Sequence, residues 1–486
     1  MPHAHPSPRR RPKYISRLAS ASLAAVVASL CLASPAAAQD EEEAEDPPSI
    51  LLIVTDDQRW DTLWAMPEVQ ESLVEEGITF SEAFTTSSLC CPSRASILTG
   101  AYPHTTGVYR QALPHGGFKS FDDSTTIATA LRAGGYRTGF FGKYLDSYQS
   151  DALAGYVPPG WDRWAAFVHA EYFDYGLTID GRVQRFGLGP EDYSTDVIAA
   201  KAEEFIRGND GPLFAIFAPA APHHPALPAP PDGGSFANLP AWRPASFNER
   251  DVSDKPEHVQ AMIPLGPDRT EDLDALEDTG RLDDALVIYT SDNGLLWGEH
   301  RWVKKEVPYE EAIRIPLVVR ASSIVGDTSR TDPHLVANID LAPTIAEAAG
   351  VVLPGADGRS LVPLLEGGAE RWRHALLIEH LRGTNPIPTY CAVRTARYLF
   401  ASYDTGEREL YDLEADPFQL RNLAGSAPGL QTRLQSAVDR LCDPRPPGFR
   451  QQMGLAATLI AIMAVLASAA AARALLGTSA ATGRVA

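Results

Sequence analysis

The sequence predicts an α/β fold in which helices sandwich a large, mixed but mostly parallel sheet, followed by a small antiparallel α+β subdomain. Continuous apolar runs without polar alternation are typical of strands that are buried on both faces of such a sheet. They recur at residues 50–54, 139–141, 213–217, 286–289 and 317–319. Helical patterns at 124–133 and 194–207 lie between several of these runs. Strands that alternate with helices favour an α/β sandwich, which we predict for residues 49–382.

The pattern changes after Arg382, where short strand-like segments are joined by turns. These segments cover residues 391–395, 398–403 and 409–413, and a helical pattern follows at 430–441. Short strands in succession, closed by one helix, indicate an antiparallel α+β unit. We therefore predict a separate C-terminal subdomain over residues 383–445.

Composition excludes two classes of protein. The 486 residues are 44% hydrophobic, which is enough for a large core and excludes disorder as the main state. Asp and Glu number 62 against 42 Lys and Arg, so the formal net charge is −20. Binding to phosphate backbones needs a surplus of basic residues. Nucleic acid is therefore excluded as the main partner.

The N-terminal segment has the pattern of a signal peptide. Five basic residues lie between Arg9 and Arg17, an apolar run covers residues 18–33, and Ala36 and Ala38 supply the small side chains of a cleavage site. We expect cleavage after Ala38, which removes residues 1–38 and exports the protein. Residues 39–48 then form an acidic linker that is solvated rather than folded.

The C-terminal segment predicts a membrane anchor. Residues 453–472 are 20 residues without a charge, bounded by Arg450 and Arg473. A helix of that length spans roughly 30 Å, the thickness of the bilayer's hydrocarbon core. We expect a transmembrane helix with a short cytoplasmic tail at 473–486, on an exported domain that faces the outside. A soluble Ala-rich helix, and hence a secreted protein, is the alternative.

Oxygen-bearing side chains follow two of the predicted strands. Asp56 and Asp57 come after the first run, and Asp292 and Asn293 come after the run at 286–290. Ligands bind at the carboxyl ends of strands in open α/β sheets. Carboxylate and amide oxygens suit Ca²⁺ or Mg²⁺. Ordinary turn and helix-cap chemistry is the alternative interpretation of each motif taken singly.

A third motif, Cys90-Cys91-Pro92-Ser93-Arg94 followed by Leu98-Thr99-Gly100, is highly specific. It resembles the signature of the type I sulfatases of the alkaline phosphatase superfamily, Cys-x-Pro-Ser-Arg with a following Leu-Thr-Gly. The resemblance implies an alkaline-phosphatase-like fold and oxidation of Cys90 to formylglycine by a dedicated formylglycine-generating enzyme. Cys91 does not fit that role, because the residue two positions after it is Ser93.

The resemblance extends through most of the exported region and implies further site residues. Asp56, Asp57, Asp292 and Asn293 match the family's ligands to one Ca²⁺, with residue 90 completing the shell. Lys143, in a Gly-Lys-Tyr-Leu stretch similar to that of N-acetylglucosamine-6-sulfatase-like members, matches a lysine that binds the sulfate group. His223, in Pro-His-His-Pro, matches the acid/base, with His224 as the competitor. Lys305 matches the second substrate lysine, with Lys304 as the competitor.

The charges of these groups suit sulfate ester hydrolysis. Negative charge accumulates on the bridging oxygen as the S–O bond breaks, and a cation with Lys143 and Lys305 would offset it. In the family, hydrated formylglycine attacks sulfur, and its second hydroxyl later expels sulfate. We expect Arg94 to orient that nucleophile and His223 to protonate the leaving alcohol.

Three points stay open in the sequence. Cys391 and Cys442 can form a disulfide in an exported protein, or remain as buried thiols. His104 and His300 can reach the site or be structural. Residues 266–284 are shorter than the corresponding helix of the family. A catalytically dead binding protein is therefore one alternative, and a phosphonate monoester or phosphodiester hydrolase of the same superfamily is another.

Overall fold

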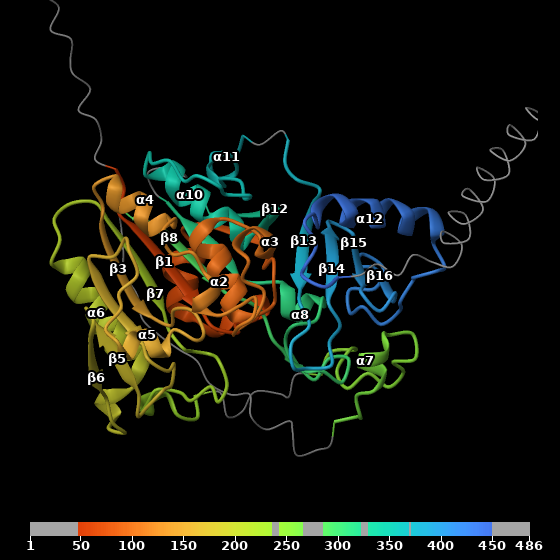
Figure 1. The fold of residues 1–486 in the computed structure, drawn as a ribbon, viewed down its shortest axis with the longest axis horizontal. Helices are drawn as coiled ribbons and strands as arrows, with labels where there is room; N and C mark the ends of the chain where they lie inside the picture. The colour runs from red at the N-terminus through yellow and green to blue at the C-terminus, as the bar shows by residue number, and fades with distance from the viewer. Residues whose placement is uncertain (1–46, 236–242, 266–284, 322–328, 369–370, 450–486) are drawn as a thin grey trace, which may run out of the picture. The chain divides into compact units, whose positions relative to one another are not determined.

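A computed structural model describes residues 47–235, 243–265, 285–321, 329–368 and 371–449, and its largest element is a ten-stranded sheet (Figure 1). The strands run in the order β12-β2-β11-β8-β1-β7-β3-β4-β5-β6. Their bounds are β1 (Ile50–Thr55), β2 (Ile78–Phe84), β3 (Arg137–Gly142), β4 (Arg163–Phe167), β5 (Gly176–Ile179), β6 (Arg182–Arg185), β7 (Leu213–Ala218), β8 (Leu286–Ser291), β11 (Leu317–Arg320) and β12 (Arg330–Ala337).

The centre of this sheet is parallel and its flanks are mixed, as the sequence predicts. Strands β8, β1, β7, β3 and β4 pair in parallel, whereas β11 pairs in antiparallel fashion with both β8 and β2. All five predicted runs are strands of the sheet, so the predicted fold class is confirmed. β2, β4, β5, β6 and β12 have no counterpart among the strands predicted from the sequence.

The alternation of side chains along β1 explains how one sheet carries two apolar faces. Ile50, Leu52 and Val54 point into the largest hydrophobic cluster, whereas Leu51 and Ile53 pack against a second cluster on the other face. Both faces of the central strands are therefore shielded from water, and a continuous apolar sequence is what such a position requires.

Helices cover the two faces of the sheet (Figure 1). α2, α4 and α10 contribute side chains to the cluster that holds Ile50 and Leu52, and α6 buries Ile198, Ala202 and Phe205 against β3, β4 and β7. Burial at three- and four-residue spacing is the pattern of an amphipathic helix. The α-helices are α1 (Pro67–Val69), α2 (Cys90–Thr99), α3 (Pro103–Thr106), α4 (Ile127–Ala133), α5 (Gln149–Leu153), α6 (Ser194–Arg207), α7 (Glu257–Gln260), α8 (Glu310–Ile313), α10 (Leu341–Ala348), α11 (Val362–Leu365) and α12 (Pro428–Leu441).

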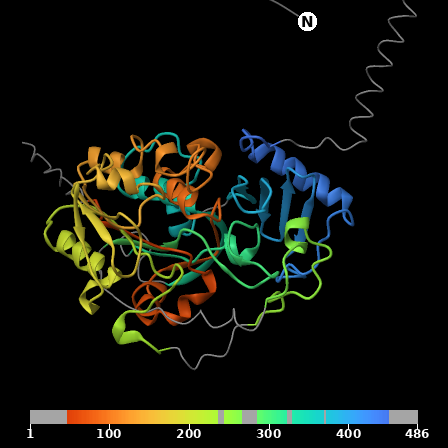
Figure 2. The ribbon, with the colours of Figure 1, turned by 60° about the horizontal axis from the view of Figure 1, so that its bottom comes forward.

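A four-stranded antiparallel sheet forms the C-terminal part, in the order β13-β14-β15-β16 (Figure 2). Its strands are β13 (Ala375–His380), β14 (Tyr390–Thr395), β15 (Tyr398–Tyr403) and β16 (Arg408–Asp412). β13 lies before residue 383, at which the predicted subdomain begins. Its hairpin partner β14 follows after a short loop, so the new sheet starts earlier than the change of sequence pattern indicates.

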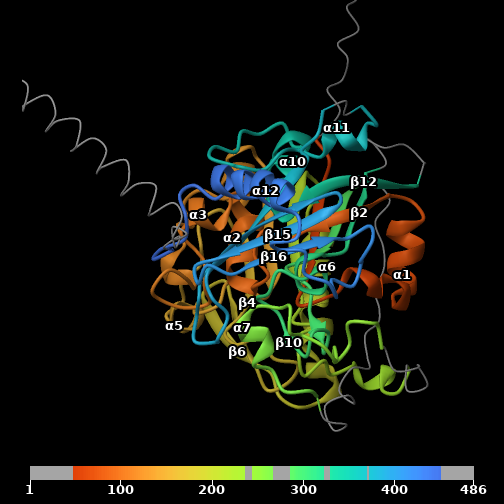
Figure 3. The same ribbon diagram turned by 90° about the vertical axis from the view of Figure 1, so that its right-hand side faces the viewer.

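α12 lies across one face of the small sheet (Figure 3). Leu434 and Val438 of the helix pack with Leu377, Val393 and Phe400 of the strands. Cys391 and Cys442 form a disulfide, with Cα atoms 6.4 Å apart, that ties β14 to the end of α12. The other face of the sheet packs against Trp302, Val307 and Tyr309 of the segment that leads to α8.

Several predicted segments lie outside the described residues. They are the signal peptide at 1–38, most of the linker at 39–48, the shortened region at 266–284, and the anchor and tail at 453–486. Within the described ranges, every helix is too short or too polar to cross a bilayer.

Candidate active site

The carboxyl ends of β1 and β8 bring four oxygen-bearing side chains together. Thr55 is paired with Ser291, so the next residues of both strands, Asp56 and Asp57 on one side and Asp292 and Asn293 on the other, are neighbours. All four side chains are buried. The Asp57 backbone N–H donates to Oδ1 of Asp292 at 3.2 Å. Asp57 also has φ 66°, a conformation that Asp tolerates better than most residues and that often occurs at functional sites.

Cys90 is the first residue of α2 and faces these carboxylates. Its Sγ lies 3.4 Å from Oδ1 of Asp56 and 3.9 Å from Oδ1 of Asp57, and the side chain has no exposed surface. Burial, and then the charge of Asp56, raise the pKa of the Cys90 thiol well above its usual value. The amino-terminal end of a helix carries a partial positive charge, which favours negative charge that develops near residue 90.

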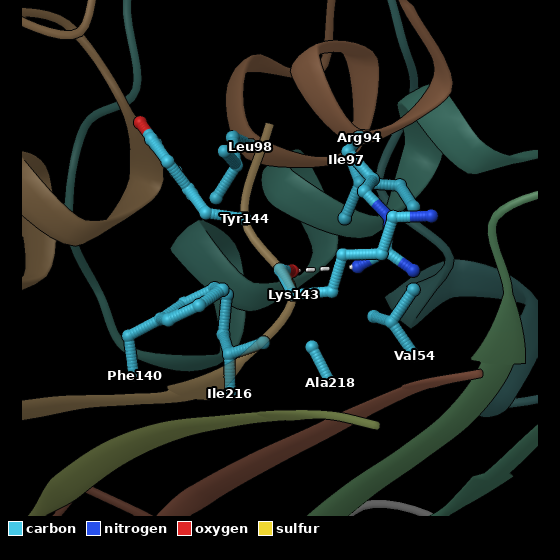
Figure 4. A pocket seen from close by; sticks show the side chains of 9 residues that line it. All are labelled: Val54, Arg94, Ile97, Leu98, Phe140, Lys143, Tyr144, Ile216 and Ala218. Carbon is cyan, nitrogen blue, oxygen red and sulfur yellow. Dashed lines mark hydrogen bonds between the residues drawn. The ribbon is translucent and has the colours of Figure 1, made fainter. Parts of the chain in front are cut away.

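Arg94 lies one turn further along α2 and ties the helix to the strand ends. Its Nε donates to Oδ2 of Asp292 at 2.8 Å, and its Nη1 donates to the backbone carbonyl of Lys143 at 2.8 Å (Figure 4). Apolar side chains such as Val54, Ile97 and Phe140 surround the stems of Arg94 and Lys143, with a remaining cavity of about 20 Å³. A cavity of this size holds about one water at most, so little water reaches the stems of these two side chains.

Two lysines complete the charge balance of the site. Lys143 follows β3 and its ammonium pairs with Asp56, and the Lys305 ammonium pairs with Asp57 and lies 2.6 Å from Sγ of Cys90. Burial alone would raise the pKa of the Asp56 carboxyl, but the charges of Lys143 and Arg94 outweigh it and lower that pKa to about 2. Lys304, the competitor of Lys305, is exposed on β10 (Val303–Lys304) and lies outside the cluster.

His223 reaches the same group from the segment after β7. Its Nε2 lies 3.7 Å from Oδ2 of Asp57, and its Nδ1 lies 2.8 Å from the carbonyl oxygen of His224. Because a carbonyl only accepts, Nδ1 carries a hydrogen and Nε2 is the nitrogen that faces the site. The Tyr172 hydroxyl holds this segment by donating to the carbonyl of His223 at 2.7 Å.

The donor set fits a hard divalent cation. Ligand atoms of Asp56, Asp57, Cys90 and Asp292 all lie within 4.8 Å of one another. Asn293 contacts this group through Nδ2, which donates to Oδ1 of Asp57 at 2.6 Å, and its Oδ1 is buried and accepts no hydrogen bond. An unpartnered buried oxygen is costly, and a cation is one partner that would satisfy it. The predicted ligands therefore converge.

The structure pairs the two other candidate histidines with carboxylates away from this cluster. Nδ1 of His104 lies 2.8 Å from Glu379 of β13, and Nδ1 of His300 lies 2.5 Å from Glu249. Glu379 and His300 have no exposed surface, so these pairs hold buried segments together. In this arrangement Nδ1 of each histidine is engaged by a carboxylate that is not one of the predicted metal ligands.

Sequence reasoning missed the residues that line the approach to the site. We call this hollow of about 320 Å³ the strand-end cavity; it is lined by Asp56, Gln111, Lys143, Asp146, His169, Ala170, Glu171, Tyr172, Ala220, His223, His224 and Pro225. His169 to Tyr172 follow β4, a strand that the sequence did not predict. Recognising Trp164-Ala165-Ala166-Phe167 as a short buried strand would have drawn attention to the polar residues after it.

Comparison with known proteins matches both parts of the chain. The family model described as Sulfatase matches residues 48–252, and the model described as N-sulphoglucosamine sulphohydrolase, C-terminal, matches residues 298–442. The N-acetylglucosamine-6-sulfatase of Homo sapiens is 34% identical over 442 residues, covering 76% of this chain and 80% of that protein. The extracellular sulfatase SULF-1 homolog of Drosophila melanogaster is 31% identical over 366 residues, covering 67% of this chain and 32% of that protein.

Among solved structures, BT4656 in complex with its substrate D-glucosamine-2-N,6-O-disulfate superposes with a TM-score of 0.70. The match covers 84% of this chain and 100% of that chain at 22% sequence identity. This comparison bears on the fold, which agrees with the mixed sheet and the small C-terminal sheet described above.

Proposed function

The chain belongs to the sulfatase family and is a sulfuric ester hydrolase, and from this premise we propose that it hydrolyses a sulfate monoester on a carbohydrate. The observation that carries the proposal is the convergence of Cys90, two lysines and His223 on one cluster of buried carboxylates. The human relative is named for N-acetylglucosamine 6-sulfate, which supports a 6-sulfated hexosamine as the first substrate to test.

Cys90 is the proposed nucleophile position, matured to formylglycine. Its place in Cys-x-Pro-Ser-Arg supports this role. So does its position at the amino-terminal end of α2, next to the carboxylates of Asp56 and Asp57. Hydrated formylglycine supplies a hydroxyl that attacks sulfur and a second hydroxyl whose deprotonation expels sulfate. Maturation requires a formylglycine-generating enzyme as a partner of the newly made chain.

A single Ca²⁺ is the proposed cofactor. Asp56, Asp57, Asp292 and Asn293 would hold it, together with residue 90, and the unpartnered Oδ1 of Asn293 supports this assignment. Bound Ca²⁺ supplies positive charge that offsets the charge developing on the sulfate group. Arg94 keeps Asp292 oriented through its hydrogen bond at 2.8 Å.

Lys143 and Lys305 are proposed to bind the sulfate oxygens. Each ammonium is held by a carboxylate, Asp56 for Lys143 and Asp57 for Lys305, which keeps both lysines charged and limits their rotamers. Preorganised cations need no reorganisation when charge develops in the transition state, and their stabilisation is large where water is excluded. These two lysines would therefore contribute to kcat as well as to binding.

His223 is proposed to donate a proton to the leaving alcohol. A sugar hydroxyl is a poor leaving group as an alkoxide, so its departure needs a general acid. When protonated, His223 presents Nε2–H toward Asp57 and the site, since Nδ1 is engaged by the carbonyl of His224.

The proposed location is the outside of the cell. The disulfide between Cys391 and Cys442 suits an oxidising compartment, and the Drosophila relative is named an extracellular sulfatase. A signal peptide at 1–38 and a C-terminal anchor at 453–472 are parts of the proposal. The anchor is tested by comparing how much of the full chain, and of a chain ending at residue 449, stays in membranes washed with carbonate.

The deciding experiment combines mass spectrometry with substrate comparison. The protein is exported from a host that has a formylglycine-generating enzyme, and the peptide containing Cys90 is weighed. We expect a formylglycine mass and hydrolysis of N-acetylglucosamine 6-sulfate, with no turnover by Cys90→Ala. An aryl phosphonate monoester hydrolysed faster than an aryl sulfate would instead assign the protein to phosphonate hydrolysis. A matured protein that turns over no ester would favour a binding role.

A further inference from the structure

The strand-end cavity is contiguous with the proposed catalytic cluster. Asp56, Lys143 and His223 belong to both, so whatever carries the sulfate ester extends into this hollow. Its volume of about 320 Å³ lies at the lower end of the roughly 300–1,000 Å³ of small-molecule sites. The cavity therefore suits the sugar unit that bears the ester.

Contacts between neighbouring loops fix the walls of this cavity. The Ser147 hydroxyl donates to the carbonyl of Gln111 at 2.9 Å, and the Tyr172 hydroxyl donates to the carbonyl of His223 at 2.7 Å. A third contact joins the side chains of Gln149 and His169. Each contact links two segments that lie far apart in the chain and meet at this cavity.

Carboxylates outnumber lysine and arginine in this lining, which also holds His169, His223 and His224. Asp146 and Glu171 are carboxylates in addition to Asp56, which is already paired with Lys143. Among the lining residues that the structure describes, Lys143 is the sole lysine or arginine. Asp146 is half-buried and Glu171 is exposed, so both carboxylates contribute negative charge to the cavity.

We propose that Asp146 and Glu171 are specificity residues that favour a sugar with neutral or cationic substituents next to the sulfate ester and disfavour one with a second sulfate. This inference rests on the proposed function, because the ester must bind at Lys143 and Lys305. A hydroxyl, amide or ammonium group can donate to an exposed carboxylate of the lining such as that of Glu171. A second sulfate bound in this cavity would share it with the carboxylates of Asp146 and Glu171 and with no unpaired lysine or arginine of the lining, and like charges repel.

A matched pair of substrates tests this assignment. N-acetylglucosamine 6-sulfate and D-glucosamine-2-N,6-O-disulfate share the ring and the 6-sulfate and differ in the second anionic group. We expect the kcat/KM of the matured enzyme to be at least about tenfold higher for the monosulfate. Asp146→Asn and Glu171→Gln should each reduce this ratio several-fold, mainly through faster turnover of the disulfate. Because Glu171 is exposed, its share should shrink as salt is raised.

The control is Glu71→Gln, which removes an exposed carboxylate of η2 (Gln70–Val74) that does not line the cavity. This variant should keep the wild-type ratio. An equal preference for both sugars in the wild type, or a ratio that neither Asp146→Asn nor Glu171→Gln changes, would overturn the assignment.

A binding measurement separates this inference from the proposed function. In a Cys90→Ala background, which retains the cavity, the dissociation constants of both sugars are measured with and without Asp146→Asn. A lower dissociation constant for the disulfate alone in Asp146→Asn supports the specificity role, even where the wild type hydrolyses neither sugar. Failure to hydrolyse either sugar would count against the proposed function only. Turnover of both sugars without discrimination would refute only the specificity role.

Discussion

The ammonium group of Lys305 lies 2.6 Å from the sulfur of Cys90, although the two residues are 215 positions apart in the chain. Lys305 belongs to the loop between β10 and α8, which packs against the small C-terminal sheet through Val307 and Tyr309. One side of the nucleophile is therefore built by the large sheet and the other by a segment that the small sheet supports.

Replacement of Lys305 tests its part in catalysis. Lys305→Met removes the charge while keeping the apolar stem, and we expect kcat/KM to fall about 10²–10³-fold, as loss of a preorganised charge in a buried site does. The matched control is Lys304→Met at the adjacent, exposed position, which should leave kcat/KM within about twofold. Steady-state kinetics on matured protein, with equal formylglycine content verified by mass, makes the comparison. Equal losses in both variants would contradict the assignment.

The general-acid role of His223 predicts a dependence on the leaving group. His223→Asn should lower kcat for a sugar 6-sulfate by about 10²–10⁴-fold, because an alkoxide leaves poorly without a proton. An activated aryl sulfate, whose phenolate leaves readily, should lose far less. His224→Asn serves as the neighbouring comparison and should affect both substrates weakly and alike. A uniform loss on both substrates in His223→Asn would indicate a binding role instead.

The Ca²⁺ site predicts stabilisation that does not depend on turnover. A ligand at 100 times its Kd stabilises the folded state by about 2.7 kcal/mol, so removal of Ca²⁺ by a chelator should lower the Tm by several degrees. Asn293→Leu removes the unpartnered amide oxygen and should abolish this Ca²⁺-dependent shift. Thermal unfolding at matched Ca²⁺ and Mg²⁺ concentrations provides the measurement. An unchanged Ca²⁺ shift in Asn293→Leu would exclude this residue as a ligand.

His380 of β13 predicts a loss of stability in acid. Burial, and then the neighbouring His258, lower its pKa from 6.5 to about 3 in the folded protein. The unfolded state therefore binds the proton first, so full stability is present above about pH 6.5 and declines as the pH falls toward 3. At pH 5 the loss is about 2 kcal/mol. Urea unfolding between pH 7.5 and 5 should show a shallower pH dependence in His380→Gln, whereas exposed His374→Gln should follow the wild type.

Arg394 joins the small sheet to the large one through a buried ion pair. Its Nε lies 2.7 Å from Oε1 of Glu310, and its Nη2 lies 2.9 Å from Oε2 of Glu82 on β2. Arg394→Met leaves Glu82 and Glu310 with their longer contacts to Arg314, at 3.2 and 3.8 Å, and should destabilise the protein by at most about 3–5 kcal/mol. Arg397→Met removes an exposed, solvent-screened pair with Asp412 and should change the free energy of unfolding far less. Similar costs in chemical denaturation would contradict a special role for Arg394.

A strand of this fold could be predicted when its own residues are apolar enough to indicate burial. β1 and β8 are continuously apolar and are recognisable alone. β2 contains Glu82, a charge that is tolerated in a sheet strand because distant arginines pair with it: Arg394, 312 positions away, and Arg314. No local pattern contains that information, so β2 was missed.

The site followed the same division. Asp56 and Asp292 were predictable because they come directly after recognisable strands, and a known signature marked Cys90. Glu171 and His169 line the strand-end cavity only because β4 joins the sheet beside β3. The residues beside them in the cavity, such as Gln111, Asp146 and His223, come from three distant segments of the chain. Only the tertiary fold brings these segments together.

Because Cys90 is completely buried, the order of oxidation and folding decides whether a molecule becomes active. A side chain with no exposed surface cannot enter the active site of a second enzyme once α2 has packed, so on the proposed function its oxidation must precede folding. Folding and the oxidation of Cys90 then compete in time. A chain that folds before it is oxidised stays inactive. The specific activity of a preparation would thus depend on the fraction of molecules that were oxidised before they folded. Treating the folded protein with the modifying enzyme would not raise it.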